Sequence, residues 1–347
     1  MVKVLRLKKE QAQAAKEFLQ QKGWFATGTM IGRSVQRYVL LPLNEKADEK
    51  ALLKKFKPAS IENRNLQAFP ALPGNLKILL RGIVPEKALD ELIKSYDTVG
   101  DIAVLDIPPK LERFEGQIAH AMKRAYPNLK VIAKKAGKRE AIERVLPLKI
   151  ISGENRLVTM YKEHEVPMKV DLEKVYFSPR ASGERFRIAQ LVKRNEKVLV
   201  MFGGIAPYAL VIAKLQPNCK IWSVELNPDA HELAETNVRI NRFGHIVTPI
   251  LGDVLEVVPK IGERFDRTIM PLPNQSWTYL PLALEYSAPS ATIHFMVTVK
   301  DRELDKVKTK IEETAKKAGK KIEIKNWRLF GSFAPRINRY TFDILVK

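Results

Sequence analysis

The stretch "KVLVMFGGIAPYALVIAK" (Lys197–Lys214) decides the fold that we predict for this chain. It reads as a buried strand, a turn containing Gly203 and Gly204, and then a helix. In an open α/β sheet this first turn is where a nucleotide-like ligand binds, because glycine lets the backbone approach the ligand closely. The stretch therefore predicts a Rossmann-like sheet with a ligand at the turn.

Strand and helix patterns continue to alternate after this stretch. They are "KIWSVEL" (220–226), "DAHELAETNVRINRF" (229–243), "IVTPILGD" (246–253) and "RFDRTIMPLP" (264–273). Such alternation indicates a parallel, doubly wound sheet. The chain then adds a strand at 292–300, a charged helix from 302 to about 317, and the closing strand "RYTFDILVK".

Two carboxylates follow the next two predicted strands. Glu225 lies about 20 residues beyond the turn, where a carboxylate can bind both ribose hydroxyls, and Asp253 can accept from the exocyclic amine of adenine. G-x-G-x-x-G and a Walker lysine are both missing, which disfavours a dinucleotide or a nucleoside triphosphate. The set resembles the S-adenosyl-L-methionine pocket of class I methyltransferases; the alternative is a generic α/β domain in which both acids cap helices.

Breaks rich in proline and glycine, together with the patterns of predicted strands and helices, indicate three domains. Residues 1–70 read as a small N-terminal α+β unit that closes before "FPALPGN" (69–75), whose two prolines and glycine interrupt the chain. Residues 76–175 read as a middle α+β domain, with strands at 102–107 and 157–163 and a helix at 110–126. Residues 176–347 form the predicted class I methyltransferase domain.

The charge balance favours a polyanionic partner. The chain has 60 Lys and Arg against 39 Asp and Glu, a formal net charge of +21, which indicates nucleic acid. Residues 110–149 hold 11 Lys and Arg against 4 Asp and Glu, so this segment is the expected phosphate-binding region. The alternative is a solvated helix-and-loop face.

Other classes of protein are disfavoured. One cysteine excludes an internal disulfide framework, and five scattered histidines disfavour a metal site. The longest nearly apolar run, Val198–Ala213, has 16 residues broken by two glycines and a proline, too short for a membrane span. The first 20 residues carry charges throughout, unlike a signal peptide. We therefore expect a cytoplasmic protein with no membrane segment and no metal.

Several stretches together resemble one family. "VDLEKVYFSPRASGER" (170–185), "FGGIAPYAL", "VELNP" and "IMPLP" are similar to archaeal and eukaryotic tRNA guanine-37 N1-methyltransferases, including the archaeal wyosine-pathway subgroup. "SYDTVGDIAVLDIP" and "ISGENRLVTMYKEH" resemble that family's middle domain, and "SFAPRINRYTFDILVK" resembles its C-terminal end. The resemblance implies methyl transfer from S-adenosyl-L-methionine to N1 of guanosine 37, with the tRNA body and anticodon stem-loop as partner and a monomeric enzyme.

The reaction needs two groups from the protein. Guanine N1 carries a proton at neutral pH, so a general base and a stabiliser of the negative charge that grows on O6 are required. By motif correspondence Glu184 is the expected base, with an N-terminal helix cap as the alternative role. Arg144 is the expected O6 partner; Arg139 competes for that role, and a phosphate contact is the alternative.

The resemblance also gives the expected binding residues. The N-terminal aromatics Trp24 and Phe25 are expected in a small core rather than on RNA, and Arg180 is expected on RNA or on the cofactor carboxylate. The RNA contacts are Lys134, Lys135, Lys138, Arg139 and Asn274. The cofactor contacts are Tyr176, Phe177, Arg180, Phe202, Gly203, Gly204, Ile205, Pro207, Glu225, Leu226, Asp253, Val254 and Pro271.

Two places depart from the family pattern. The usual "F-A-G-x-G-P" has Ala206 at its later glycine, which demands either a negative φ or strain. The usual "N-L-P" becomes Pro271-Leu272-Pro273, which removes an amide expected on the target base, and Asn274 comes three residues later.

The missing amide leaves four functions open. N1 methylation persists if recognition moves to Arg144, Asn274 or Gln275, and this is the activity we expect. The alternatives are C7 methylation of a tricyclic wyosine precursor at the same position, transfer of the cofactor's aminocarboxypropyl group, and a noncatalytic tRNA-binding protein with a vestigial pocket.

Overall fold

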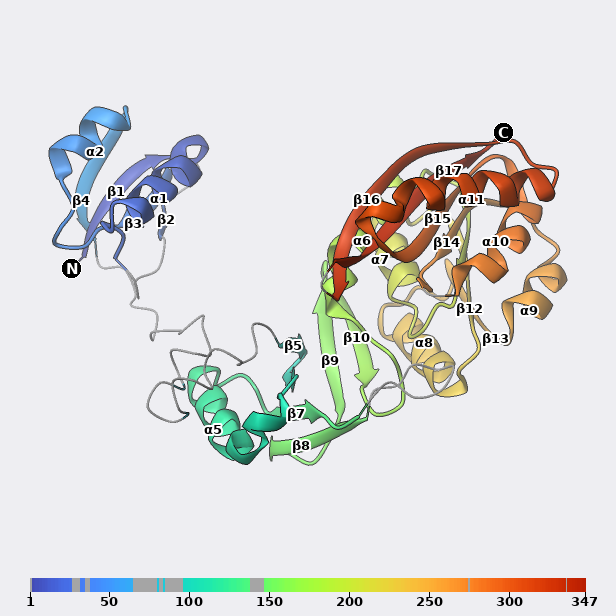
Figure 1. Ribbon diagram of the computed structural model, residues 1–347, viewed down its shortest axis with the longest axis horizontal. Coiled ribbons are helices and arrows are strands. Elements are labelled where there is room, and N and C mark those ends of the chain that lie inside the picture. Colours follow the sequence, from blue (N-terminus) through green and yellow to red (C-terminus); the bar gives the residue numbers. More distant parts are fainter. Residues whose placement is uncertain are drawn as a thin grey trace. The chain divides into compact units, whose positions relative to one another are not determined.

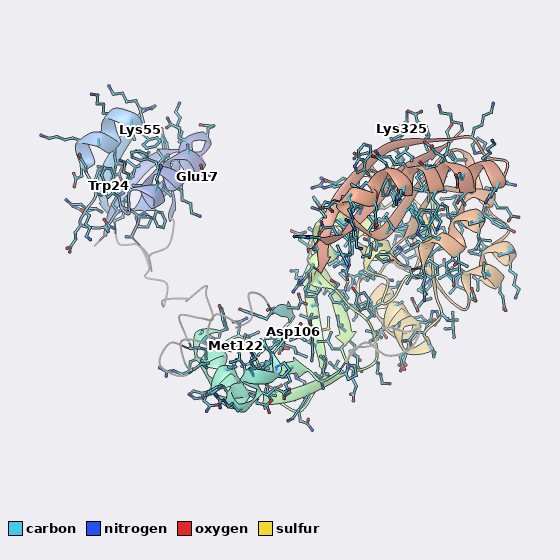
Figure 2. The ribbon with its side chains drawn as sticks, viewed as in Figure 1. Glu17, Trp24, Lys55, Asp106, Met122 and Lys325 are labelled. Atoms are coloured by element: carbon cyan, nitrogen blue, oxygen red, sulfur yellow. The ribbon has the colours of Figure 1, made fainter. Side chains whose placement is uncertain are left out.

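The computed structural model describes residues 2–26, 32–34, 38–64, 80, 84, 96–137, 147–273, 275–334 and 336–347. The chain divides into two compact units, residues 1–89 with 121–127 and residues 90–120 with 128–347 (Figure 1). Long basic side chains such as Lys55 and Lys325 lie on the surfaces of these units (Figure 2). Arg144, Lys138, Arg139 and Asn274 fall outside the described residues.

The N-terminal unit is a four-stranded antiparallel sheet with two helices. The sheet has the order β2-β3-β1-β4, and Leu5, Leu7 and Leu41 on its strands form the core with α1. Trp24 and Phe25 pack against this core, as expected, and Trp24 meets Phe18 edge-on at 6.0 Å. The elements are β1 (Val2–Lys8), η1 (Lys9–Gln11), α1 (Ala12–Gln21), β2 (Gly32–Ser34), β3 (Tyr38–Pro42), α2 (Glu49–Lys55) and β4 (Ala59–Arg64).

The second unit begins with a four-stranded sheet of order β5-β6-β7-β8 and a separate two-stranded antiparallel ribbon, β9-β10. Only β6 and β7 run parallel in that four-stranded sheet, because a helical connection joins them. The elements are β5 (Asp97–Val99), β6 (Ile102–Leu105), η2 (Pro109–Phe114), α5 (Glu115–Ala125), β7 (Val131–Lys135), β8 (Leu148–Gly153), β9 (Val158–Glu163), β10 (Val166–Asp171), η3 (Pro179–Ala181) and α6 (Ser182–Leu191).

A seven-stranded sheet follows, in the order β13-β12-β11-β14-β15-β17-β16. Five strands are parallel, as the sequence pattern predicted, but β17 lies antiparallel between β15 and β16. The expectation of a wholly parallel sheet was therefore incomplete, and β16 was not predicted. The elements are β11 (Lys197–Met201), α7 (Pro207–Leu215), β12 (Lys220–Glu225), α8 (Pro228–Ile240), β13 (Val247–Leu251), α9 (Val254–Ile261), β14 (Phe265–Met270), α10 (Ser276–Glu285), β15 (Ser287–Lys300), η4 (Asp301–Glu303), α11 (Leu304–Lys317), β16 (Ile322–Ala334) and β17 (Ile337–Val346).

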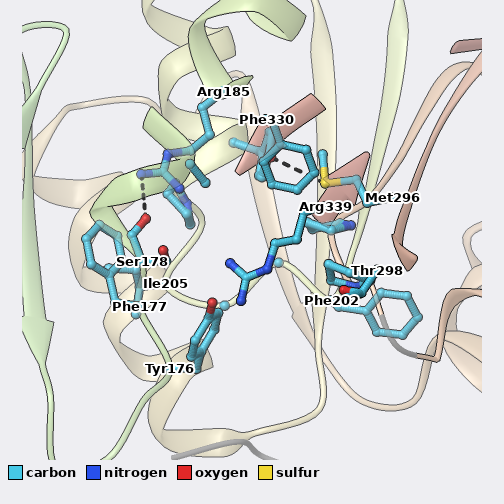
Figure 3. A pocket seen from close by; sticks show the side chains of 17 residues that line it. Tyr176, Phe177, Ser178, Arg185, Phe202, Ile205, Met296, Thr298, Phe330 and Arg339 are labelled. Carbon is cyan, nitrogen blue, oxygen red and sulfur yellow. Dashed lines mark hydrogen bonds between the residues drawn. The ribbon is translucent and has the colours of Figure 1, made fainter. Parts of the chain in front are cut away.

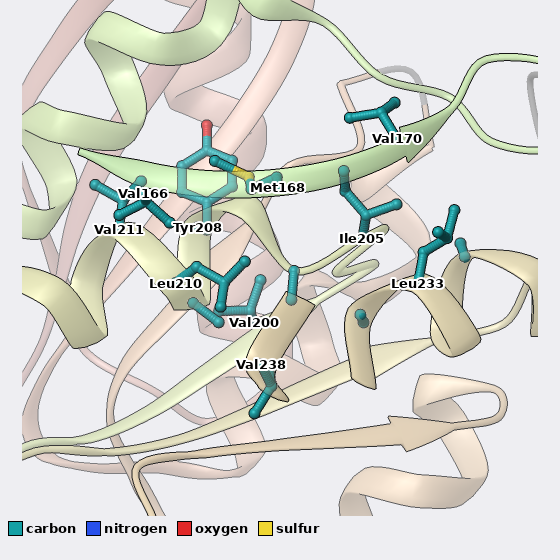
Figure 4. Close-up of a cluster of buried hydrophobic side chains, with 14 of the residues drawn as sticks. Val166, Met168, Val170, Val200, Ile205, Tyr208, Leu210, Val211, Leu233 and Val238 are labelled. Atoms are coloured by element: carbon teal, nitrogen blue, oxygen red, sulfur yellow. The ribbon is translucent and has the colours of Figure 1, made fainter. Parts of the chain in front are cut away.

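Both faces of this large sheet are buried. Along β11, Val198 and Val200 belong to one hydrophobic cluster and Leu199 and Met201 to another, because successive side chains of a strand point to opposite faces. Each such side chain contributes about 1.5–3 kcal/mol by leaving water. The first cluster also takes in Met168 of β10, beside α7 (Figure 4), so the ribbon is packed onto one face of the large sheet and its helices.

Candidate functional site

The site begins where β11 and β12 end. Glu225, the last residue of β12, accepts hydrogen bonds from the backbone N–H of Gly204 (2.6 Å) and of Asn227 (2.9 Å). Asn227 then caps α8 by accepting from the N–H of Asp229 (2.9 Å). One carboxylate therefore fixes both turns that border the predicted ribose position.

The backbone of the glycine turn is strained. Phe202 and Ala206 have φ values of 56° and 67°, in the left-handed region that costs a residue with a side chain about 1–2 kcal/mol. Of the two conformations expected for Ala206, the strained one occurs. Strained backbone persists where surrounding structure holds it, often at binding sites. Gly203 is needed for packing, because a Cβ there would lie 2.1 Å from Ser223 Oγ.

A first cavity, which we call the nucleoside cavity, opens beyond these strand ends. Asp253 lies in its wall and caps α9 by accepting from the N–H of Leu255 (2.9 Å), so it also has the helix-capping role weighed as the alternative. The lining residues are Tyr176, Phe202, Gly204, Val224, Glu225, Leu226, Asn227, Ala230, Gly252, Asp253, Val254, Pro271, Leu272, Gln275 and Tyr279.

A second cavity, which we call the acceptor cavity, adjoins the first and shares four lining residues with it, Tyr176, Phe202, Gly204 and Pro271. Its walls are largely aromatic and apolar (Figure 3). The other lining residues are Phe177, Ser178, Ala181, Arg185, Gly203, Ile205, Pro207, Tyr208, Pro273, Met296, Thr298, Phe330 and Arg339.

A buried ion pair supports one wall of the acceptor cavity. Arg185 on α6 donates to both carboxylate oxygens of Glu163 on β9, at 2.5 and 2.7 Å, and to the carbonyl of Ser178 at 3.2 Å. Burial opposes its charge, yet the bonds to Glu163 keep the pKa of Arg185 above its usual range. The charge of Arg185 is thus balanced within the protein, and its role here is to hold the loop that carries Phe177.

The expected base, Glu184, lies between the cavity-lining residues Ala181 and Arg185 on α6 but does not itself line the cavity. Its side chain is 1% exposed, and both oxygens accept from Arg187, at 2.8 and 2.9 Å. Arg187 also donates to both oxygens of Asp343, at 2.8 and 3.0 Å. Each carboxylate oxygen has two lone pairs, so Glu184 has lone pairs left for a further hydrogen bond.

The network continues inward from Asp343. His294 Nδ1 donates to Asp343 (2.6 Å), and its Nε2 accepts from Arg267 (2.7 Å), because a guanidinium can only donate. Burial lowers the pKa of His294, so the ring is neutral with its proton on Nδ1. Burial alone would raise the pKa of Asp343, but the hydrogen bonds from His294 and Arg187 lower it to about 2. The hydrogen-bond network ends at Glu196, whose two carboxylate oxygens accept from Arg267 at 2.7 and 2.9 Å.

The loop after β14 is fixed to the sheet. The carbonyl of Pro273 accepts from the N–H of Thr298 on β15 (3.1 Å), and the carbonyl of Leu272 accepts from the N–H of Ser276 (3.1 Å). Pro271 lines both cavities and brings no amide to them. The position of the usual asparagine is therefore at the junction of the cavities but has no polar side chain.

Other predicted residues lie elsewhere. Arg180 lines neither cavity and donates to Asp97 (2.6 Å), so its cofactor and RNA roles stay predictions. Lys134 is 8% exposed and pairs with Glu115 (2.6 Å) and with a second glutamate, a position that disfavours a phosphate contact. Lys135 pairs with Asp106 at 2.7 Å. Four of the remaining expected cofactor residues, Phe177, Gly203, Ile205 and Pro207, line only the acceptor cavity, and the others line the nucleoside cavity or both. Part of the expected cofactor site therefore lies in the acceptor cavity.

Sequence reasoning missed the contributions of the C-terminal strands. Met296 and Thr298 on β15, Phe330 on β16 and Arg339 on β17 line the acceptor cavity. They carry no motif of their own, because long-range strand pairing brings them there. Arg185 had a usable signal, since it is next to Glu184 in "SGER".

The described residues offer neither a membrane span nor a metal centre. Among them, none of the helices is long and apolar enough to cross a membrane. Nor do three or more His, Cys, Asp or Glu side chains gather there in a group that could hold a metal ion.

A glycine turn after β11, an acid at the end of β12 and an acid after β13 thus border one cavity at the carboxyl edge of a doubly wound sheet, with an acceptor cavity beside it. This combination defines the class, a Rossmann-like methyltransferase. The family model described as TRM5/TYW2 methyltransferase domain matches residues 159–324, and that described as TYW2 N-terminal domain matches residues 76–156.

Named relatives agree with these matches. The tRNA (guanine(37)-N(1))-methyltransferase Trm5b of Pyrococcus abyssi is 31% identical over 268 residues, 76% of this chain and 78% of the relative. Trm5b of Methanocaldococcus jannaschii is 34% identical over 72% of this chain and 71% of its own. The tRNA (guanine(37)-N(1))/4-demethylwyosine(37)-methyltransferase Taw22 of Nanoarchaeum equitans is 30% identical over 72% of this chain and 99% of its own.

Solved structures agree as well. The crystal structure of Trm5b from Pyrococcus abyssi has a TM-score of 0.73, 27% identity and coverage of 100% of both chains. A complex of aTrm5 with tRNALeu has a TM-score of 0.71, 27% identity and coverage of 99% of both chains. The chain belongs to the TRM5/TYW2 family of methyltransferases. This confirms the family, the Rossmann-like fold, the enzyme class and S-adenosyl-L-methionine as the cofactor expected from the sequence.

Proposed function

We propose that this chain transfers a methyl group from S-adenosyl-L-methionine to N1 of guanosine 37 of tRNA. The observation that carries the proposal is the pair of adjoining cavities, which meet at Pro271 and Tyr176. The nucleoside cavity has Glu225 and Asp253 for the adenosine part of the cofactor, and the aromatic acceptor cavity suits an extruded base. Two relatives are named for guanine-37 N1 methylation, and this chain matches more than two thirds of the length of each.

Glu184 is the general base of the proposed mechanism. S-adenosyl-L-methionine supplies a methyl group on a sulfonium, which becomes a neutral thioether. Glu184 takes the N1 proton as the N1 electron pair bonds to the methyl carbon, while Arg187 holds the carboxylate on both oxygens. Arg144, which lies outside the described residues, remains the candidate for stabilising the charge on O6.

The same proposal assigns the rest of the chain to tRNA. Residues 1–70 recognise the tRNA body, residues 76–175 link that part to the catalytic domain and contact RNA, and residues 176–347 hold the cofactor and the target base. The net charge of +21 supports a polyanionic partner. We assign the enzyme to the cytoplasm. We also propose that it is a monomer, and light scattering with and without tRNA would test this oligomeric state.

A second candidate function follows from one observation. Pro271 stands where the family has an asparagine amide, so a contact to the target base is changed. C7 methylation of a tricyclic wyosine precursor at position 37, alone or in addition to N1 methylation, fits such a change. The dual name of the Nanoarchaeum relative is consistent with this candidate. A noncatalytic tRNA-binding protein is the remaining alternative.

The test is nucleoside mass spectrometry of position 37 after incubation with labelled cofactor. An unmodified tRNA transcript with G37 should yield 1-methylguanosine, and a G37→A37 transcript is the matched control that should yield no label. If the protein binds the cofactor but leaves G37 unlabelled, N1 methylation is excluded and tRNA carrying the tricyclic precursor becomes the substrate to assay. If the cofactor does not bind, only the RNA-binding function survives.

A further inference from the structure

Two polar side chains enter the acceptor cavity from β15 and β17, two neighbouring strands near the C-terminal end of the chain. Thr298 on β15 and Arg339 on β17 are direct Cα partners in an antiparallel pair, so their side chains share one face of the sheet. Both line the acceptor cavity. In Figure 3 the guanidinium of Arg339 extends across the cavity toward Tyr176.

These two side chains lie beside the loop that lacks the family's amide. The N–H of Thr298 donates to the carbonyl of Pro273 at 3.1 Å, which fixes β15 against the Pro271-Leu272-Pro273 loop. Prolines have no N–H, so Pro271 and Pro273 offer the cavity no donor. Arg339 and Thr298 therefore place a cation and a hydroxyl next to the site of the lost donor.

Two further polar side chains of the cavity, Arg185 and Tyr208, have partners within the protein. Arg185 donates to both oxygens of Glu163 and to the carbonyl of Ser178. The hydroxyl of Tyr208 points to the sulfur of Met296, at 3.6 Å. The enclosed Oγ1 of Thr298 has no hydrogen-bond partner among the described residues, so it has the capacity to bond to a ligand in the cavity.

We propose that Arg339, assisted by Thr298, recognises the O6 and N7 edge of the target base and so replaces the missing asparagine. The proposal rests on the function proposed above, because it deepens the acceptor role of the same cavity. A guanidinium pairs with O6 and N7 of guanine through two parallel hydrogen bonds. The aromatic walls, which include Tyr176 and Phe330, supply the faces on which a flat base stacks.

This mode of recognition has a consequence for the range of substrates. The O6 and N7 edge is shared by guanine and by tricyclic bases built from it, whereas the third ring is closed through N1 and the exocyclic amine. An amide that reads the Watson–Crick edge would discriminate between the two kinds of base. Arg339 reads a common edge, so the cavity accepts guanine and a tricyclic derivative of it.

Binding to modified RNA tests the contact without requiring turnover. The full chain, saturated with S-adenosylhomocysteine, is titrated with anticodon stem-loops that carry at position 37 guanine, 2-aminopurine, which lacks O6, or 7-deazaguanine, which lacks N7. The wild type should prefer guanine over each analogue. Arg339→Met should weaken guanine binding about 5- to 150-fold, which corresponds to the 1–3 kcal/mol of a bidentate base contact, and should weaken binding of 2-aminopurine, which keeps only N7, by a smaller factor.

Three further variants distinguish a specific contact to the base from nonspecific electrostatic attraction to the RNA. Arg336→Met removes an equal charge from the exposed β16–β17 turn and should weaken all three RNAs equally or none. Arg339→Lys keeps the charge but loses the planar fork, so it should lose the preference for guanine. Thr298→Val removes only the hydroxyl and should reduce that preference by a smaller factor.

Four results would overturn the proposal. Equal weakening of all RNAs by Arg339→Met would mean a phosphate contact, and weaker binding of S-adenosylhomocysteine would mean a cofactor contact. A wild type that does not distinguish guanine from the analogues, or an Arg339→Met variant of unchanged preference, excludes the base contact directly. Failure of the proposed function appears separately, as lack of 1-methylguanosine in the wild-type assay on tRNA.

Discussion

At the scale of single residues, the sequence motif selected Glu184 but left its surroundings unknown. The structure gives it a buried position and a two-point ion pair with Arg187, which in turn holds Asp343. A carboxylate oriented on both oxygens has few accessible rotamers, so its remaining lone pairs keep a fixed direction. Orientation of this kind is what a general base requires before its proton affinity matters.

Glu184→Gln tests this role. The amide preserves the size of the side chain but cannot take the N1 proton, so the turnover number should fall at least ~100-fold while the dissociation constants for tRNA and S-adenosyl-L-methionine change little. Single-turnover kinetics and equilibrium binding measure these quantities. Glu173→Gln, an exposed carboxylate before the same motif, is the matched control and should leave turnover unchanged. Unaltered turnover in Glu184→Gln would place the base elsewhere.

At the scale of elements, the turn between β11 and α7 requires glycine at two adjacent positions for two different reasons. Gly204 has a φ of 57°, a conformation open to glycine at little cost. Gly203 is instead required because its hydrogen lies where a side chain would collide with Ser223 on β12. The turn therefore approaches β12 closely, which lets Glu225 reach the N–H of Gly204.

The Gly203–Ser223 contact predicts a rescue. Gly203→Ala should weaken cofactor binding at least ~10-fold, because the new Cβ would lie 2.1 Å from Ser223 Oγ and push the turn away. Ser223→Ala alone should be nearly neutral, since that hydroxyl has no hydrogen-bond partner among the described residues. The double variant should recover most of the affinity in calorimetric titration. Additive losses would show that the turn is displaced for another reason.

The sheet order was only partly predictable at this scale. Alternating apolar strands and helices indicated the parallel strands β11 to β15, since buried parallel strands are continuous apolar runs. β16 has the exposed residues Lys325, Trp327 and Leu329 along its length, so it lacks the apolar run by which the others were found. The antiparallel β17 was expected as a strand, but its place between β15 and β16 depends on pairing that no local pattern encodes.

At the scale of the whole molecule, the chain has separate hydrophobic cores. Leu5, Leu7 and Leu41 belong to the core of the N-terminal unit, whereas the seven-stranded sheet has a cluster on each face. A small core gives little net stability, because conformational entropy offsets most of the burial. The two units should therefore unfold as separate events.

Scanning calorimetry with and without cofactor tests this expectation. The full chain should show two transitions, and S-adenosyl-L-methionine at 100 times its dissociation constant should stabilise only the larger one, by about 2.7 kcal/mol. A variant lacking residues 1–70 should lose the smaller transition and keep the ligand-induced shift. A single transition that moves as a whole with the ligand would show that the units unfold together.

Features that depend on neighbours along the chain could be predicted from the amino-acid sequence. It predicted the strand-turn-helix at Lys197–Lys214, the acids Glu225 and Asp253 and the motif containing Glu184, because periodicity, turn chemistry and motif spacing are local. The partners of those groups became known from the three-dimensional structure. Arg187 meets Asp343 across 156 residues, and Arg339 reaches the acceptor cavity through its pairing with Thr298. Contacts of this kind arise when distant strands pair, and the entropy of closing such long loops is offset by burial of the whole sheet rather than by any single motif.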